Sequence, residues 1–224
     1  MLHTMASFVI LFQVKRKSPD SVKKKTRTRD LEASRKEILN ATFFEVFSKG
    51  FQGVSIDDIV KKTSLTKGAF YHQFPTKLDL GYALVEEVIS PMIIDRWIQP
   101  LEKFENPIEG ILHQLQKNIG DVDPSLLKLG CPLNNLVQEM SPIDKGFKKR
   151  LNVALNLWIN ETEKHLKRGQ NAGFIKKSIN LKDIAHFVVM AHEGFYGMMK
   201  GVEDPHLFKS LNRSLKIYFD SIRI

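Results

Sequence analysis

The sequence contains little cysteine and no long hydrophobic run. Cys131 is the only cysteine among 224 residues, so an intrachain disulfide is excluded, which suits a reducing cytoplasm. The apolar run of residues 8–12 is far shorter than the roughly 20 residues of a membrane span. Its positive charge follows the run instead of preceding it, unlike in a secretory signal. We therefore expect neither export nor a membrane anchor. Residues 1–14 are expected to form a loose tail, unless the natural protein starts further along the chain.

Motifs of the common enzyme classes are also missing. There is no phosphate-binding glycine loop, no nucleophile elbow and no His-Glu-x-x-His. His186 and His192 are six residues apart, which does not place them on one helical face, and no metal-ligand spacing surrounds Cys131. The pair His192–Glu193 is better explained as a core pair or a pocket hydrogen bonder than as a catalytic dyad. The sequence predicts no enzyme, no cofactor and no metal site.

Acidic residues are nearly absent from one segment, residues 15–29, which has eight basic residues, one acidic residue and a net charge of +7. Since the whole chain carries +9, this segment accounts for most of the excess. A segment so highly charged cannot bury apolar surface, and we expect residues 1–30 to form a disordered basic arm. It either lies along nucleic-acid phosphates or only aids solubility, and the first interpretation is favoured by the segment that follows.

Helix signals punctuate the rest of the chain. Several helices are expected to begin at a capping residue followed by proline: Asn106-Pro107, Asp123-Pro124, Ser141-Pro142 and Asp204-Pro205. Others are expected to begin at a capping box: Ser55-x-x-Asp58, Thr76-x-x-Asp79 and Asn180-x-x-Asp183. Glycines are expected to end helices at Gly50, Gly53, Gly173 and Gly201. No alternating run reaches strand length, so the fold class is all-α, with about nine or ten helices.

Apolar spacing divides these helices into an N-terminal helix-turn-helix head and a larger helical body. One helical face, on a helix from about Ser34 to Lys49, contains Leu39, Phe43, Val46 and Phe47. A longer helix beginning at Thr76 has a stripe of Leu78, Tyr82, Val85, Ile89 and Met92. We predict a head over residues 31–80 and a larger helical body over residues 81–224.

Residues 55–74 read as a short helix, a turn and a second helix. The first helix buries Ile56, Ile59 and Val60, and Leu65 points inward from the turn. Thr66 caps the second helix, in which Phe70 and Phe74 are an i, i+4 pair that belongs in the core. Lys67, Ala69, Tyr71 and His72 are left near the outer face. A helix of this kind fits the major groove, with its N-terminal residues nearest the base edges.

Each candidate contact has a chemical reason. Lys67 can donate to guanine, Ala69 suits a thymine methyl, and Gly68 permits close approach. Tyr71, His72 and Lys77 carry donors that can reach phosphate, as do the backbone amides at the helix starts. Gln73 can donate but cannot be charged. The predicted DNA-binding residues are Ser55, Thr66, Lys67, Gly68, Ala69, Tyr71, His72, Gln73, Thr76 and Lys77.

Three runs carry a family resemblance: Ile38-Leu39-Asn40-Ala41 with Phe47-Ser48-Lys49-Gly50-Phe51, Ser55-Ile56-Asp57-Asp58-Ile59-Val60, and Leu65-Thr66-Lys67-Gly68-Ala69-Phe70-Tyr71-His72-Gln73-Phe74-Pro75-Thr76-Lys77-Leu78-Asp79-Leu80. Over residues 35–85 the chain resembles TetR-type (TetR/AcrR) transcriptional regulators in spacing, caps and identities. It departs at Gln73, where the family often has histidine. The resemblance implies a homodimer that binds a two-fold symmetric DNA operator, with repression as the family's usual action. It makes residues 31–80 the DNA-binding domain and residues 81–224 the domain that binds a small-molecule effector and forms the dimer.

The body offers a dimer surface and residues for a pocket. The helix over residues 181–200 is apolar almost all round, so we expect a partner chain to cover part of it. With the helix over residues 142–170 it resembles the pair that forms a four-helix dimer bundle in TetR-type proteins. Most aromatic and methionine side chains are simply core, and the candidates for lining an effector pocket are Trp97, Phe104, Cys131, Met140, Trp158, His192 and Phe195.

Cys131 has two interpretations. It caps a helix that starts at Pro132, where amides and the helix dipole favour thiolate, and residues 130–140 resemble a segment of a TetR subgroup. Some TetR-type regulators sense electrophiles or oxidants through cysteine. The favoured interpretation is nevertheless a small buried hydrophobe with an inert sulfur.

These observations predict a cytoplasmic, sequence-specific, DNA-binding transcriptional regulator. The alternative is a nonspecific DNA-binding architectural protein, because the basic arm alone is sufficient for nonspecific binding. Within residues 30–80, seven acidic and seven basic residues cancel. Bulk attraction to DNA must therefore come mainly from the arm, while the head supplies a few placed contacts.

Overall fold

The computed structural model describes residues 27–204 and 206–224, and within them it contains helices and one isolated β-bridge, between Ile175 and Arg223, but no strand. The all-α expectation is confirmed. The basic arm was expected to be disordered over residues 1–30, but residues 27–30 belong to the helix that begins at Arg27, so this part of the expectation is wrong, and residues 1–26 lie outside the described residues. The head contains α2 (Arg27–Lys49), α3 (Ile56–Val60), α4 (Lys67–Gln73) and α5 (Lys77–Leu84). The body continues with η1 (Val85–Ile89), α6 (Ser90–Ile93), η2 (Ile94–Ile98), η3 (Gln99–Lys103), α7 (Pro107–Leu115), η4 (Gln116–Gly120), α8 (Pro124–Leu127), α9 (Pro132–Met140), α10 (Lys145–Asn171), α11 (Leu181–Val202) and α12 (Leu207–Ile222).

Side-chain caps start the helices of the head as the sequence predicts. The Ser55 hydroxyl accepts from the Asp58 amide at 3.1 Å, and the Asp58 carboxylate accepts from the Ser55 amide at 3.0 Å. Thr76 and Asp79 form the same reciprocal pair at the start of α5. Because each box satisfies amides that the helix itself leaves open, it fixes where the helix begins.

Three predicted helix starts are wrong, for local reasons. α2 begins at Arg27 instead of Ser34, since the residues between them include good helix formers and no proline or glycine. α10 begins at Lys145 instead of Pro142, because the Asp144 carboxylate caps it by accepting from the Phe147 amide at 2.7 Å. α12 begins at Leu207, two residues later than predicted from the Asp-Pro signal.

The glycine signals are correct at two of four positions. Gly50 and Gly173 follow α2 and α10 with φ angles of 79° and 87°, a left-handed conformation that suits glycine. Gly53 lies in the turn after α2 and ends no helix. Gly201 lies inside α11, which ends at Val202, and Glu203 takes the left-handed conformation with φ 52°. The predicted stop at Gly201 is therefore wrong by two residues.

The helix expected from Thr76 to Met92 is a continuous path through α5, η1, α6 and η2, with π-helical turns at Val85–Ile89 and Ile94–Ile98. A π-turn inserts an extra residue and rotates the buried face relative to a regular helix. Val85, Ile89 and Met92 of the predicted stripe are buried, whereas Leu78 is 40% exposed. Counted as continuous paths, the described residues form ten helical stretches, within the predicted range.

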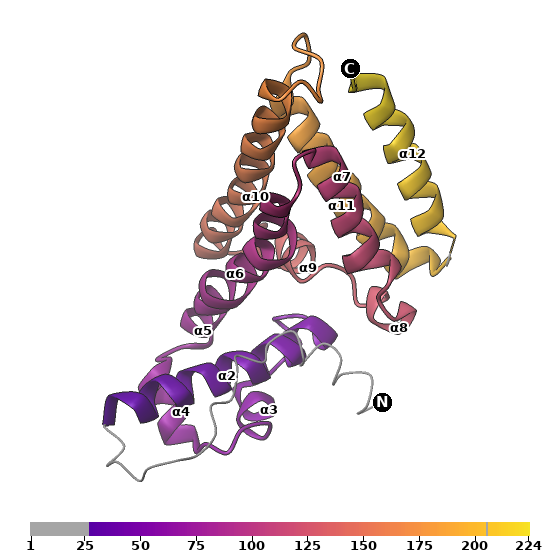
Figure 1. Cartoon of the computed structure of the whole chain (residues 1–224). Coiled ribbons are helices and arrows are strands. Elements are labelled where there is room, and N and C mark those ends of the chain that lie inside the picture. The colour runs from indigo at the N-terminus through magenta and orange to yellow at the C-terminus, as the bar shows by residue number, and fades with distance from the viewer. Residues whose placement is uncertain (1–26, 205) are drawn as a thin grey trace, which may run out of the picture.

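The head lies at one end of the molecule and is joined to the body by α5 and α6 (Figure 1). One buried cluster runs from the predicted face of α2 (Leu39, Phe43, Val46 and Phe47) through α5 and α9 to Trp158 of α10, so the two parts share a core. A second cluster fills the body between α7, α11 and α12. None of the helices in the described part of the chain is long and apolar enough to cross a membrane.

Candidate nucleic-acid interface and effector cavity

The pairing of α3 with α4 is held by both apolar and polar contacts. Ile59, Phe70 and Phe74 are buried, and Leu65 packs against the same core from the turn. Thr66 caps α4 by accepting from the Ala69 amide at 3.2 Å. The carboxylate of Glu37 in α2 accepts from the Ser64 amide at 2.6 Å and from the Ser64 hydroxyl at 3.1 Å. Glu37 thus fixes the turn, a role that no sequence pattern indicates because the two residues are 27 positions apart.

The outer face of α4 is open to solvent. Lys67, Gly68, Tyr71 and His72 are exposed and Ala69 is half-buried. Lys67 is the residue nearest the start of this face, and its amine forms an ion pair of 2.7 Å with the Asp57 carboxylate of α3. Both side chains are more than half exposed, so the pair is weak in energy and easily exchanged for another partner.

Three other predicted contact residues have partners inside the protein. The amide nitrogen of Gln73 donates to the Leu31 carbonyl at 2.9 Å, so its side chain points toward α2. The Ser55 and Thr76 hydroxyls and amides are held by the carboxylates of their capping boxes. These carboxylates also place negative charge at the helix starts, which disfavours a phosphate there.

Lys77 lies at the contact between head and body. Its amine stands 4.8 Å from the centroid of the Phe51 ring and 3.4 Å from the Gln52 carbonyl oxygen, and burial lowers its pKa. On the same turn, the Glu139 carboxylate of α9 accepts from the Phe51 amide at 2.8 Å and from the Gln52 amide at 2.7 Å. One carboxylate of the body therefore holds the turn between α2 and α3.

A small cavity lies in the body, with about 40 Å³ of free space, room for only a few water molecules. The cavity is lined by residues of seven elements, α2, α6, η2, η4, α8, α9 and α11, and of the segments before α8 and α9. Its polar lining is supplied by Arg96, Asn118, Cys131, His192 and Tyr196. Burial lowers the pKa of Arg96 and raises that of Tyr196.

The structure brings three of the seven predicted pocket residues to this cavity: Trp97, Cys131 and His192. Trp158 lies behind them, with its ring 5.4 Å from Trp97 and 4.7 Å from His192. The lining of this cavity does not include the remaining three, Phe104, Met140 and Phe195. The predicted pocket residues did not include Arg96, Asn118 and Tyr196. Arg96 could have been predicted, because an arginine between the isoleucines of an apolar helix is unusual.

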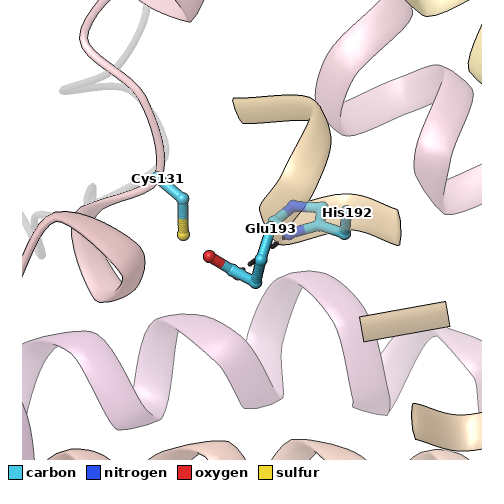
Figure 2. A group of neighbouring side chains, drawn as sticks. All are labelled: Cys131, His192 and Glu193. Atoms are coloured by element: carbon cyan, nitrogen blue, oxygen red, sulfur yellow. Dashed lines mark hydrogen bonds and ion pairs between the residues drawn. The ribbon is translucent and has the colours of Figure 1, made fainter. Parts of the chain in front are cut away.

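Cys131, His192 and Glu193 form a cluster beside the cavity, with donor atoms within 4.8 Å of one another. Figure 2 shows the Cys131 sulfur pointing toward the Glu193 carboxylate, with the His192 imidazole on the other side of it. His192 Nδ1 lies 3.0 Å from Glu193 Oε1. Burial, and next the Glu193 charge, raise the pKa of the Cys131 thiol, while the nearby amides of Asn134 and Leu133 oppose this shift. A raised pKa disfavours the thiolate, which is the form of cysteine that reacts with electrophiles.

A helix-turn-helix with an open second helix, joined to a larger helical body, defines a DNA-binding regulator. Sequence models confirm this class: one described as "Bacterial regulatory proteins, tetR family" matches residues 38–84, and one described as "Tetracyclin repressor-like, C-terminal domain" matches residues 112–215. The chain belongs to the TetR family of bacterial transcriptional regulators. This is a family of regulators and not of enzymes.

Individual relatives of the chain are also named as transcriptional regulators. An uncharacterized HTH-type transcriptional regulator of Lactococcus lactis is 27% identical over 195 residues, covering 86% of this chain and 96% of that protein. The HTH-type transcriptional repressor DhaR of a Mycobacterium species is 23% identical, covering 68% of this chain and 75% of DhaR. A TetR-family regulator structure from Cytophaga hutchinsonii matches with a TM-score of 0.76 at 21% identity, covering 90% of this chain and 99% of that one, which shows the shared fold.

Proposed function

We propose that this chain is a cytoplasmic homodimeric repressor that binds a DNA operator of two-fold symmetry and releases it when an effector occupies the body. The observation that carries this proposal is the open face of α4, where Lys67, Tyr71 and His72 are exposed together beyond a buried Phe70–Phe74 pair. Exposed donors on a rigid helix are what base and phosphate recognition in the major groove requires.

The contacts divide into two kinds. Lys67, at the start of α4, faces base edges, and Tyr71 and His72, a turn further on, serve the phosphates. Lys77 remains a phosphate candidate, and its half-buried amine must leave Phe51 and Gln52 to reach DNA. Lys67→Ala is therefore expected to relax the base preference at one position, while Tyr71→Ala weakens binding to every sequence.

An exposed stripe on α11 supports a dimer. Met190 and Met198 are 63% and 54% exposed. The same helix carries three glycines at which an added Cβ would meet no other atom within 4 Å: Gly194, Gly197 and Gly201. Spacings of 4, 7, 8 and 11 residues from Met190 put all five on one side of the helix. Val153 of α10 adds a further apolar side chain that is 62% exposed. Small residues between two methionines permit close helix approach across a two-fold axis.

Helix α9 supports an effector response, because it joins the cavity to the head. Its first residues, Cys131 as the cap and Pro132, line the cavity. Near its other end, Glu139 holds the amides of Phe51 and Gln52 at the start of the helix-turn-helix. A ligand that shifts the first end of this short helix therefore changes the position of a carboxylate that orients the head. Coupling of this kind needs two arrangements that the ligand distinguishes.

Footprinting on genomic fragments tests the proposal against the architectural alternative. A repressor of this family protects one or a few sites, each made of two symmetric half-sites about one helical turn apart. An architectural protein coats DNA with little site preference. Uniform coating by the full chain would overturn the proposal.

A further inference from the structure

The cluster of Cys131, His192 and Glu193 contains three kinds of metal-binding donor in one buried place. The side chains of His192 and Glu193 are 3% and 14% exposed, and Cys131 is 6% exposed as a whole residue. Thiolate, imidazole and carboxylate are the three side-chain ligands that zinc takes in proteins. The cluster combines the cap of α9 with two neighbouring residues of α11, so its ligands are 61 and 62 positions apart and no spacing motif reveals them.

The distances are close to those of a tetrahedral site. Around a zinc ion with bonds of about 2.0–2.3 Å, donor atoms stand about 3.3–3.6 Å apart. His192 Nδ1 and Glu193 Oε1 are already 3.0 Å apart, and all donors of the cluster lie within 4.8 Å of one another. Closing the remaining gap takes side-chain movements of about 1.5 Å or less, within the reach of rotations of a cysteine and a glutamate.

A second observation points to a bound cation. Glu193 Oε2 is buried and has no hydrogen-bond partner among the described residues. A carboxylate oxygen in this state is costly unless a positive group reaches it. The imidazole of His192 is held by three aromatic rings, at centroid distances of 4.6 Å from Trp97, 4.7 Å from Trp158 and 4.8 Å from Tyr196. An imidazole held this rigidly loses little conformational freedom when it binds a metal ion.

We propose that Cys131, His192 and Glu193 bind a thiophilic divalent transition-metal ion of the zinc type. The thiol proton leaves to solvent as the sulfur–metal bond forms, and the cavity supplies space for a water molecule as the fourth ligand. Arg96 lines the same cavity. The divalent ion is balanced by the ionised Cys131 and Glu193, so that the ion, these two ligands and the Arg96 guanidinium together carry a net charge of about +1. Mixed sulfur, nitrogen and oxygen donors favour zinc or cobalt over magnesium and calcium.

The test uses full-length, reduced, tag-free protein stripped of metal and titrated with Co²⁺ alone. Thiolate coordination gives a near-ultraviolet sulfur-to-cobalt charge-transfer band that saturates at about one ion per chain, and added Zn²⁺ bleaches it. Cys131→Ser is expected to abolish the band. Glu193→Gln is expected to weaken Zn²⁺ binding by about tenfold or more, measured by competition with a chromophoric chelator. Circular dichroism verifies that each variant is folded.

His186→Gln is the matched control, because His186 lies on the same helix outside the cluster. It is expected to keep the charge-transfer band and the Zn²⁺ affinity. Absence of the band from the wild-type protein, or its persistence in Cys131→Ser, would overturn the proposal. No DNA is present in this titration, so its failure leaves the proposed repressor function standing, and a failed footprint leaves the metal site standing.

Discussion

Lys67 is the base-reading candidate at the start of α4, yet in the free protein its amine is paired with Asp57 at 2.7 Å. This pair raises the pKa of Lys67, first through the hydrogen bond to Asp57, so the amine stays charged. Asp57 thus competes with DNA for Lys67 and adds a negative charge beside the phosphates. The pair holds Lys67 in place without binding it tightly, because solvent screens an ion pair between two exposed side chains.

Asp57→Asn is expected to raise operator affinity by up to about fivefold, since the carboxylate that competes with DNA for the Lys67 amine is removed. The slope of log affinity against log salt is expected to become steeper, because loss of the Asp57 charge makes the head more positive beside the DNA phosphates. Fluorescence-anisotropy titrations at several salt concentrations measure both quantities. Asp95→Asn, an exposed position of η2, is the control. Equal or weaker operator binding by Asp57→Asn would contradict the competition.

Glu139 stands out among the carboxylates because it accepts from two backbone amides of another part of the chain. Glu139→Gln is expected to lower the free energy of unfolding by about 1–2 kcal/mol, since charge-assisted hydrogen bonds become ordinary ones. A chain of this size then melts about 2–4 °C lower for each kcal/mol lost. Thermal denaturation measures the melting temperature of Glu139→Gln. Glu105→Gln, the same change at an exposed site, is the control. Equal melting temperatures would show that Glu139 does not hold the head.

At the scale of elements, the join between head and body depends on a close approach at α5. A Cβ on Gly81 would stand 2.6 Å from Phe51 Cε2 and closer still to the Phe147 ring. The rings of Phe51 and Phe147 are themselves 4.8 Å apart and pack edge to face. Glycine at this position lets α5, the turn after α2 and the start of α10 meet in one place.

Gly81→Ala is expected to destabilise the protein by about 1–3 kcal/mol, because two buried rings must move to admit one methyl group. Gly68→Ala is the control. Its Cβ would meet only Thr66 Oγ at 3.8 Å, so it is expected to stabilise α4 by up to about 1 kcal/mol. Urea denaturation of both variants checks the difference in sign, and a neutral Gly81→Ala would refute the close packing.

The capped helix starts at Ser55, Thr76 and Asn106 were predictable from sequence, since a capping box or an Asn-Pro pair acts within three residues. The Asp144 cap of α10 was missed, because the Ser-Pro signal just before it indicated an earlier start. Phe70 and Phe74 were predictable for the same reason. The π-turns at Val85 and Ile94 were not, because apolar spacing assumes a constant helical period. The cavity was predicted only in part. Trp97 and His192 stand out as large side chains in helical runs, whereas the cluster with Glu193 depends on how α9 packs against α11.

At the scale of the whole molecule, assembly is expected to depend on the exposed stripe of α11. Met198→Glu places a charge on this stripe and is expected to shift the dimer to monomer, because a buried unpaired charge is costly. Ile217→Glu, on α12 and 66% exposed, makes the same change elsewhere and is expected to stay dimeric. Light scattering coupled to size exclusion measures both masses. A monomeric wild-type protein at micromolar concentration would contradict the dimer.

The helix-turn-helix at residues 55–74 is the centre of this account, and selection of bound fragments from a genomic library, followed by footprinting, tests it most directly. We expect a short motif with two-fold symmetry, protected by the wild-type protein and bound more weakly by Tyr71→Ala. Lys67→Ala is expected to lose about 1–3 kcal/mol of discrimination at one base pair of each half-site. Fragments without a common motif, bound equally by all three proteins, would contradict it.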